Sequence, residues 1–125
     1  MVLSVPSRIL IIDDDPQILK LFAKILIQGG HSVRAENSGK GALEALHSDG
    51  PFDLVVLDLS MPPPDGFETL KTLRIRRPSL KILVSSGFLE GALLKTSEIL
   101  GATASMHKED APKLLLQTVN DLLKR

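Results

Sequence analysis

Five short apolar runs, each followed by a segment of helical periodicity, constrain the fold of this chain more than any other feature. The run from Arg8 to Ile12 is apolar throughout after its arginine, and the run from Phe52 to Leu57 is the most apolar of the five. Continuous runs of this length are typical of strands buried on both faces of a parallel sheet. The predicted strands are Arg8–Ile12, His31–Ala35, Phe52–Leu57, Lys81–Val84 and Ala102–Met106.

A helix is predicted after each strand, because capping residues and apolar periodicity recur there. Alternating strands and helices predict a parallel sheet covered on both faces. A chain of 125 residues fits one domain with one core, so we expect a single domain over residues 1–125 without an output domain. The signals are Asp15-Pro16 to Gly29-Gly30, Ser38 to Ser48, Phe67 to Pro78, Gly91 to Leu100, and Asp110 through Leu115, Val119, Leu122 and Leu123.

Composition excludes several classes of function. The 15 basic and 15 acidic residues balance, so nothing favours nucleic acid as a partner. Cysteine is absent, which excludes disulfides and thiolate metal sites. No apolar run approaches the roughly 20 residues that span a bilayer, and the N-terminus is too short for a signal peptide. We expect a soluble, cytoplasmic domain that does not contact the membrane.

Polar residues gather where the predicted strands end. Asp13 and Asp14 follow the first strand, Asp58 ends the third, Ser85 and Ser86 close the fourth, and Lys108 follows the fifth. In open α/β sheets, binding sites form beyond the carboxyl ends of the strands. We therefore expect three carboxylates, a hydroxyl and an amine to converge on one site.

These residue types favour phosphoryl transfer assisted by a hard cation. Clustered carboxylates without cysteine or suitably spaced histidines favour Mg²⁺ over zinc. A phosphoryl group in transfer spreads charge over three oxygens, which Mg²⁺, Lys108 and the Ser86 hydroxyl could neutralise. Asp58 would then be the nucleophile and form an acyl phosphate. Asp15 is interpreted as a helix cap, and His31, His47 and His107 as surface residues.

The segments IIDDDP, DLVVLDLSMPPPDGFE and ILVSSG, followed by Lys108, resemble the receiver domain of bacterial two-component response regulators. The resemblance covers essentially the whole chain, and Asp58-x-x-Met61-Pro62-x-x-Asp65-Gly66 is its most specific part. It implies a flavodoxin-like (βα)5 doubly wound sandwich with strand order 2-1-3-4-5. It also implies a regulatory domain that catalyses its own phosphorylation and dephosphorylation, rather than a conventional enzyme.

The resemblance assigns a role to each matching position. Asp58 would accept phosphate from a sensor histidine kinase or a histidine phosphotransfer protein. Asp14 would bind Mg²⁺ directly and Asp13 largely through water. The Ser60 backbone carbonyl would be a further Mg²⁺ ligand, and Lys108 matches the lysine of the family pattern. Ser86 would be the switch hydroxyl, with Ser85 as the alternative. Phe88 and Ser60 would tune water access and phosphate lifetime.

Two positions depart from the family pattern. Glu109 follows Lys108 where the family usually has proline after a cis bond. Because a cis bond before a residue other than proline costs about 2.5–4 kcal/mol, we expect a trans bond, or a strained cis one, and a shifted loop. Ser105 stands where the family often has a tyrosine or phenylalanine that changes rotamer. The route by which phosphorylation reaches the outer face is therefore open.

Partners are expected on the face made by the fourth helix, the fifth strand and the last helix, roughly residues 91–125. A downstream protein target would dock there, with the chain a monomer or a phosphorylation-linked dimer. One alternative is a small phosphatase or phosphotransferase with an aspartate nucleophile, but Ser60 stands where such enzymes need a second acid. Another is a degenerate receiver that binds partners without phosphate. A histidine phosphotransfer module would need a helical bundle.

Overall fold

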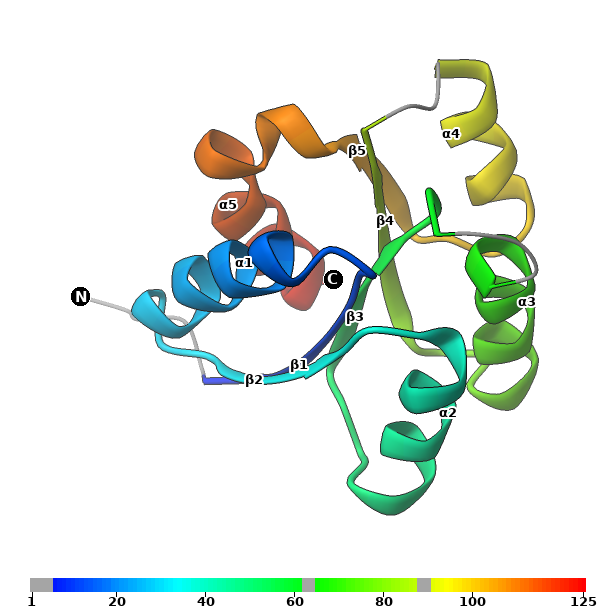
Figure 1. The fold of residues 1–125 in the computed structure, drawn as a ribbon, viewed down its shortest axis with the longest axis horizontal. Helices are drawn as coiled ribbons and strands as arrows, with labels where there is room; N and C mark the ends of the chain where they lie inside the picture. Colours follow the sequence, from blue (N-terminus) through cyan, green and yellow to red (C-terminus); the bar gives the residue numbers. More distant parts are fainter. Residues whose placement is uncertain (1–5, 62–64, 88–90) are drawn as a thin grey trace.

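The computed structural model describes residues 6–61, 65–87 and 91–125, with only the backbone at residues 65 and 91–94. Five parallel strands form one sheet in the order β2-β1-β3-β4-β5 (Figure 1). The strands are β1 (Arg8–Ile12), β2 (Ser32–Glu36), β3 (Leu54–Asp58), β4 (Lys81–Ser86) and β5 (Ala104–His107). The expected flavodoxin-like order is confirmed.

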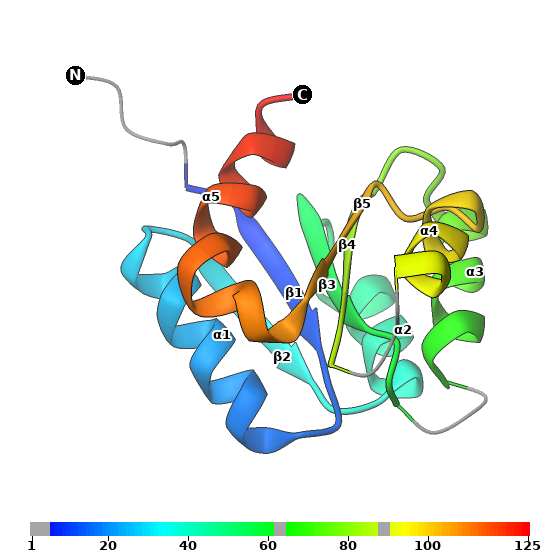
Figure 2. The same ribbon diagram turned by 90° about the horizontal axis from the view of Figure 1, so that it is seen from above.

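Five α-helices cover the sheet, α1 and α5 on one face and α2, α3 and α4 on the other (Figures 1 and 2). One apolar core lies between the sheet and the α1–α5 pair, and a second lies beneath the other three helices. The helices are α1 (Pro16–Gln28), α2 (Gly39–Ser48), α3 (Asp65–Arg76), α4 (Gly91–Ile99) and α5 (Ala111–Leu123), with a 3-10 helix, η1 (Lys108–Asp110), before α5.

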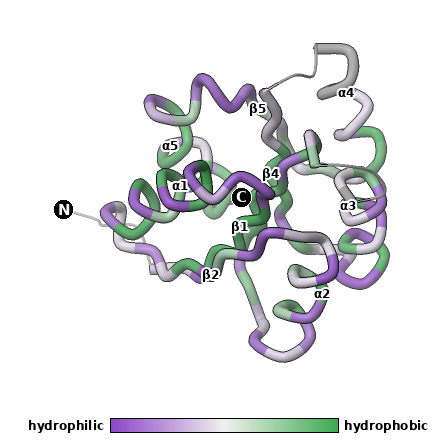
Figure 3. Tube along the Cα trace, in the orientation of Figure 1, coloured by the Kyte–Doolittle hydropathy of each residue, from purple (hydrophilic) through white to green (hydrophobic). Residues whose placement is uncertain are grey.

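The most apolar runs form strands whose two faces are both covered, whereas the edge strands β2 and β5 are less buried. Every residue of β3 is buried, and so are Ile9 to Ile12 of β1. Figure 3 shows the same pattern along the trace, with hydrophobic strands inside and hydrophilic stretches on the outer turns of the helices. The bounds of β1 are those predicted, and the other strand boundaries differ by at most two residues, as at Phe52, which lies before β3.

Two helix starts match their sequence signals to different degrees. Asp15 caps α1 through its carboxylate, which accepts a hydrogen bond from the Gln17 amide at 2.9 Å. Asp110 precedes α5 as predicted, but its side chain makes no capping hydrogen bond, because η1 already continues into the helix. Among the described residues, the cis peptide bond is Gly50–Pro51. The bond between Lys108 and Glu109 is therefore trans, as predicted, and it lies within η1.

The expectation that all three histidines lie at the surface is wrong for His31. This side chain is buried, and its Nε2 lies 2.7 Å from Asn120 Oδ1 of α5. Its Nδ1 accepts a hydrogen bond from the Ser7 amide. Because Nδ1 is an acceptor, Nε2 carries the proton and donates to Asn120. His47 is exposed and His107 is half-buried.

Candidate functional site

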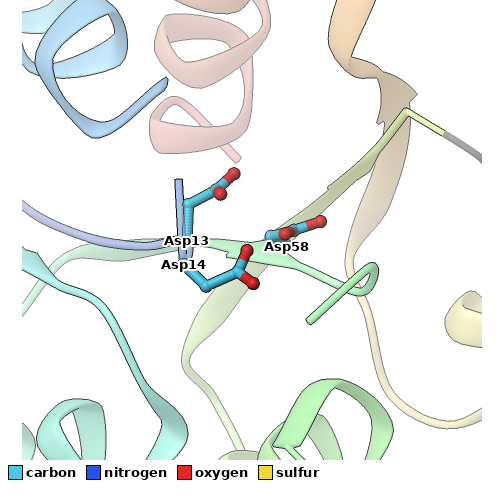
Figure 4. Close-up of side chains that lie close together, drawn as sticks. All are labelled: Asp13, Asp14 and Asp58. Atoms are coloured by element: carbon cyan, nitrogen blue, oxygen red, sulfur yellow. The ribbon is translucent and has the colours of Figure 1, made fainter. Parts of the chain in front are cut away.

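Three carboxylates meet at the carboxyl end of the sheet, from the loop after β1 and from the last residue of β3. One oxygen from each of Asp13, Asp14 and Asp58 lies within 4.8 Å of the other two. Figure 4 shows the side chains at the ends of these neighbouring strands. Asp13 and Asp58 are 2% and 1% exposed, whereas Asp14 is exposed. The grouping predicted from the sequence is therefore present in the structure.

The two buried carboxylates are held in the same way. Asp13 Oδ1 accepts a hydrogen bond from the Asp15 amide at 2.9 Å, and Asp58 Oδ1 accepts one from the Ser60 amide at 2.8 Å. Each contact spans two residues, the local turn that aspartate favours after a strand. The sequence therefore orients both side chains locally, and each directs its second oxygen towards Lys108.

Lys108 is the cation between these carboxylates. Its Nζ lies 2.7 Å from Asp13 Oδ2 and 3.1 Å from Asp58 Oδ2. The aliphatic part of the side chain passes Gly87 at the end of β4, where an added Cβ would lie 3.9 Å from Lys108 Cδ. The lysine thus reaches the site from η1 across the end of β4, and the predicted convergence includes it.

Burial and charge oppose each other in the pKa values of this cluster. Burial raises the pKa of Asp13, although hydrogen bonds from Lys108 and from the Asp15 amide act in the opposite direction. Burial lowers the pKa of Lys108, but the hydrogen bond to Asp13 and the charge of Asp58 outweigh it and leave that pKa raised. Lys108 is therefore held as a cation, and Asp13 resists ionisation.

The cluster fits a hard divalent cation. Three ionised carboxylates carry one charge more than Lys108 and a monovalent ion together could neutralise. Asp13 Oδ2 and Asp58 Oδ2 are buried and have no well-aligned hydrogen bond to a described residue. An all-oxygen donor set of this kind suits Mg²⁺, which is commonly bound through one or two carboxylates together with water. The acidic pocket could therefore bind a metal ion.

Of the two adjacent serines at the end of β4, the hydroxyl of Ser86 has a hydrogen-bond partner and that of Ser85 has none among the described residues. Ser86 Oγ lies 2.6 Å from Ser60 Oγ, and Ser86 is fully buried. Since the Ser60 amide also holds Asp58, Ser60 connects the carboxylate to the Ser86 hydroxyl. Ser85 is buried too, but its Oγ has no hydrogen-bond partner among the described residues. Sequence reasoning did not foresee the Ser60–Ser86 pair, which depends on the spacing of β3 and β4.

Two further predicted positions lie outside this cluster. Ser105 of β5 donates a hydrogen bond from Oγ to Glu98 Oε2 of α4 at 3.0 Å. A hydrogen bond between β5 and α4 is therefore made at position 105, where the family pattern often has an aromatic side chain. Phe88, expected near the site, lies outside the described residues, as do Pro62 to Pro64 of the loop after β3.

The family model described as response regulator receiver domain matches residues 9–120. The transcriptional activator protein ExaE of Pseudomonas putida is 35% identical over 92% of this chain and 54% of its own length. Protein PetR of Rhodobacter capsulatus is 34% identical over 96% of the chain and 50% of its own. The chain thus spans about half the length of these curated relatives.

Solved structures show the same architecture. A CheY-like response regulator receiver domain protein from Methanospirillum hungatei superposes with a TM-score of 0.87 at 28% identity, covering 96% of this chain and 95% of that one. The BeF3-activated N-terminal receiver domain of Klebsiella pneumoniae RstA gives 0.85 at 27% identity, covering 94% and 99%. In the part of the chain that the structure describes, no helix is both long and apolar enough to cross a membrane.

Proposed function

This chain belongs to the response regulator receiver domain family of two-component signalling, and on that premise we propose that residues 1–125 form one receiver domain phosphorylated at Asp58. The observation that carries the proposal is the buried Asp58 carboxylate, 3.1 Å from Lys108 and grouped with Asp13 and Asp14. The family is regulatory, and the chemistry proposed here is limited to this chain's own phosphorylation and dephosphorylation.

The proposed reaction moves one phosphoryl group. An Asp58 carboxylate oxygen attacks the phosphorus of a phosphohistidine on a sensor kinase or histidine phosphotransfer protein. The P–N bond breaks, and its electron pair stays on the imidazole nitrogen. Lys108 and the Ser86 hydroxyl donate hydrogen bonds to phosphoryl oxygens. Lys108 Nζ is already 3.1 Å from Asp58 Oδ2, so the ammonium can move its contact from the carboxylate to an oxygen of the incoming phosphoryl group.

Magnesium is the proposed cofactor. Asp14, Asp58 and the Ser60 carbonyl would hold the ion directly, and Asp13 largely through water. When bound, Mg²⁺ supplies positive charge that neutralises a phosphoryl oxygen as charge develops there. The backbone hydrogen bonds to Asp13 and Asp58 keep both carboxylates oriented before anything binds.

Ser86 is proposed as the switch residue, with Ser60 and Phe88 tuning phosphate lifetime. In the unphosphorylated chain, the Ser86 hydroxyl pairs with Ser60 at 2.6 Å. A phosphoryl group on Asp58 would offer Ser86 a charged acceptor, and charge-assisted hydrogen bonds are roughly twice as strong as neutral ones. Ser86 would therefore turn from Ser60 towards the phosphoryl group.

The output is proposed to be a protein contact on the face formed by α4, β5 and α5. The Ser105–Glu98 hydrogen bond joins two of these elements, so it is the proposed local link in place of an aromatic side chain. The zero net charge favours a protein partner over nucleic acid. Cytoplasmic location and a change between monomer and dimer on phosphorylation belong to the same proposal.

The deciding experiment is intact mass after incubation with acetyl phosphate and Mg²⁺. We expect one added phosphoryl group on the unsubstituted chain, and none on Asp58→Asn or after chelation. Asp53→Asn, which changes an exposed aspartate near the opposite end of β3, is the matched control and should be modified normally. An adduct that persists on Asp58→Asn would contradict the proposal.

Beryllofluoride separates a short-lived phosphate from a chain that takes none. Binding without a detectable adduct would indicate rapid hydrolysis. If neither an adduct nor beryllofluoride binding appears, the chain is a receiver that docks partners without phosphate. Glu109 and Ser105, the two departures from the family pattern, are the observations that favour this second function.

A further inference from the structure

Three buried side-chain atoms in the described part of the chain lack a well-aligned hydrogen bond, and two of them belong to the site. These two, Asp13 Oδ2 and Asp58 Oδ2, are acceptors that face Lys108. The third is Ser85 Oγ, which has neither an ion pair nor a hydrogen bond. Among the described residues, Ser85 is therefore the buried side chain whose hydroxyl proton has no acceptor.

Ser85 is placed beside Asp58 by the register of the sheet. The two residues are Cα partners across β3 and β4. Side chains paired in this way leave the same face of a parallel sheet. Two residues earlier on each strand, Val56 and Leu83 both belong to the core beneath α1 and α5. Ser85 and Asp58 thus project to the α1–α5 face, and each is 1% exposed.

Ser86 cannot take this role because it projects to the other face. Val84, two residues before it, belongs to the core beneath α2, α3 and α4. Its hydroxyl pairs with Ser60 on that side. The two adjacent serines therefore approach the end of β3 from opposite faces, and only Ser85 shares a face with the Asp58 side chain.

We propose that the Ser85 hydroxyl donates a hydrogen bond to the Asp58 carboxylate and stabilises it as the leaving group in dephosphorylation. A serine hydroxyl has one proton to donate, and an ionised carboxylate only accepts. Pairing them gives the buried Ser85 hydroxyl an acceptor, and it gives Asp58 Oδ2 a hydrogen bond beside its ion pair with Lys108. The inference rests on the proposed phosphorylation of Asp58.

The step that Ser85 assists is hydrolysis of the acyl phosphate. A water oxygen attacks phosphorus, and the bond from phosphorus to the Asp58 oxygen breaks. The electron pair returns to Asp58 as carboxylate charge, and the attacking water becomes the fourth oxygen of inorganic phosphate after losing a proton to solvent. A donor to the carboxylate is worth more as this charge develops than in the acyl phosphate, so it lowers the barrier.

The test compares acyl phosphate lifetimes in Ser85→Ala and Ser85→Cys with that of the unsubstituted chain. Each is phosphorylated with acetyl phosphate, freed of the donor, and followed by intact mass. Alanine removes the donor, and cysteine keeps a weak one in nearly the same shape. We expect a lifetime about three- to tenfold longer in Ser85→Ala and an intermediate value in Ser85→Cys, as for the loss of one ordinary hydrogen bond.

A second readout needs neither phosphate nor metal. The ¹³C resonance of the Asp58 carboxyl, recorded without Mg²⁺, should shift in Ser85→Ala and less in Ser85→Cys, in samples whose thermal unfolding shows that they are folded. Unchanged resonances with lifetimes within about twofold of the parent, or lifetimes that shorten, would overturn the inference alone. An unsubstituted chain that takes no phosphate would overturn it together with the proposed function.

Discussion

Lys108 holds Asp13 at 2.7 Å, yet burial still raises the pKa of that carboxyl. The stability that Asp13 contributes is therefore fully present below its unfolded pKa of 3.8 and is lost as the pH rises through the higher folded pKa. Ionisation of Asp13 therefore costs the folded state more than the unfolded chain.

We predict that Asp13→Asn raises the free energy of unfolding at pH 7, since the amide mimics the protonated form that burial favours. The gain should shrink as the pH falls through the raised folded pKa and should be absent below 3.8, the unfolded pKa of Asp13. Urea unfolding followed by circular dichroism at several pH values measures it. Asp110→Asn, at an exposed residue without a capping hydrogen bond, is the control. A loss of stability at pH 7 would contradict this account.

Mg²⁺ should raise the melting temperature of the unsubstituted chain. At ten times its dissociation constant, an ion that binds only the folded state adds about 1.4 kcal/mol. Asp14→Asn should reduce this gain, because it removes an exposed carboxylate from the cluster without leaving a buried charge unpaired. Differential scanning calorimetry suits a chain without tyrosine or tryptophan. An identical Mg²⁺ response in both proteins would exclude Asp14 as a ligand.

Gly66→Ala should destabilise the protein through the backbone beside Asp58. A Cβ at Gly66 would lie 2.6 Å from the Leu59 carbonyl oxygen, which cannot turn away as a side chain could. Overpacking of this kind costs about 1–3 kcal/mol. Gly87→Ala is the matched control, because its nearest contact is the flexible Lys108 side chain at 3.9 Å. Equal unfolding free energies for the two variants would refute the argument.

His31 and Asn120 should be energetically coupled. Replacing either by leucine leaves the other without its hydrogen-bond partner, at a cost of about 1–3 kcal/mol. The double replacement should cost less than the sum of the single ones, because neither His31 nor Asn120 is then left facing a lost partner, and the Ser7 amide loses its acceptor equally in the single His31 variant and in the double one. A double-mutant cycle by chemical denaturation measures the difference. Additive effects would show that the 2.7 Å contact contributes little to stability.

The sequence predicted what is encoded locally and missed what depends on long-range pairing. Continuous apolar runs identify buried strands. Asp15-Pro16 identifies the start of α1 because the capping hydrogen bond joins residues only two positions apart, Asp15 and Gln17. The strand order came from the family resemblance, since periodicity does not say which strands are neighbours. His31 meets Asn120 from 89 residues away, and its local sequence, between a glycine and a serine, predicts a surface residue instead.

The candidate site follows the same division. Asp13, Asp14, Asp58 and Lys108 could be predicted to converge because all follow strand ends, which parallel strands bring to one edge. Which hydroxyl faces which neighbour could not be predicted, because it depends on the register of β3 against β4. Ser85 and Ser86 are adjacent in sequence, yet only the pairing of Asp58 with Ser85 distinguishes their faces.

The strand order places the carboxylates of the site and the ammonium of Lys108 on different strands, and an inner strand resists local unfolding more than an edge strand does. Asp13 follows β1 and Asp58 ends β3, both strands inside the sheet, whereas Lys108 follows the edge strand β5. Edge strands open more readily than strands with neighbours on both sides. A brief opening of β5 would therefore withdraw the ammonium while leaving the carboxylates together, and the site would become strongly anionic before the rest of the sheet had changed.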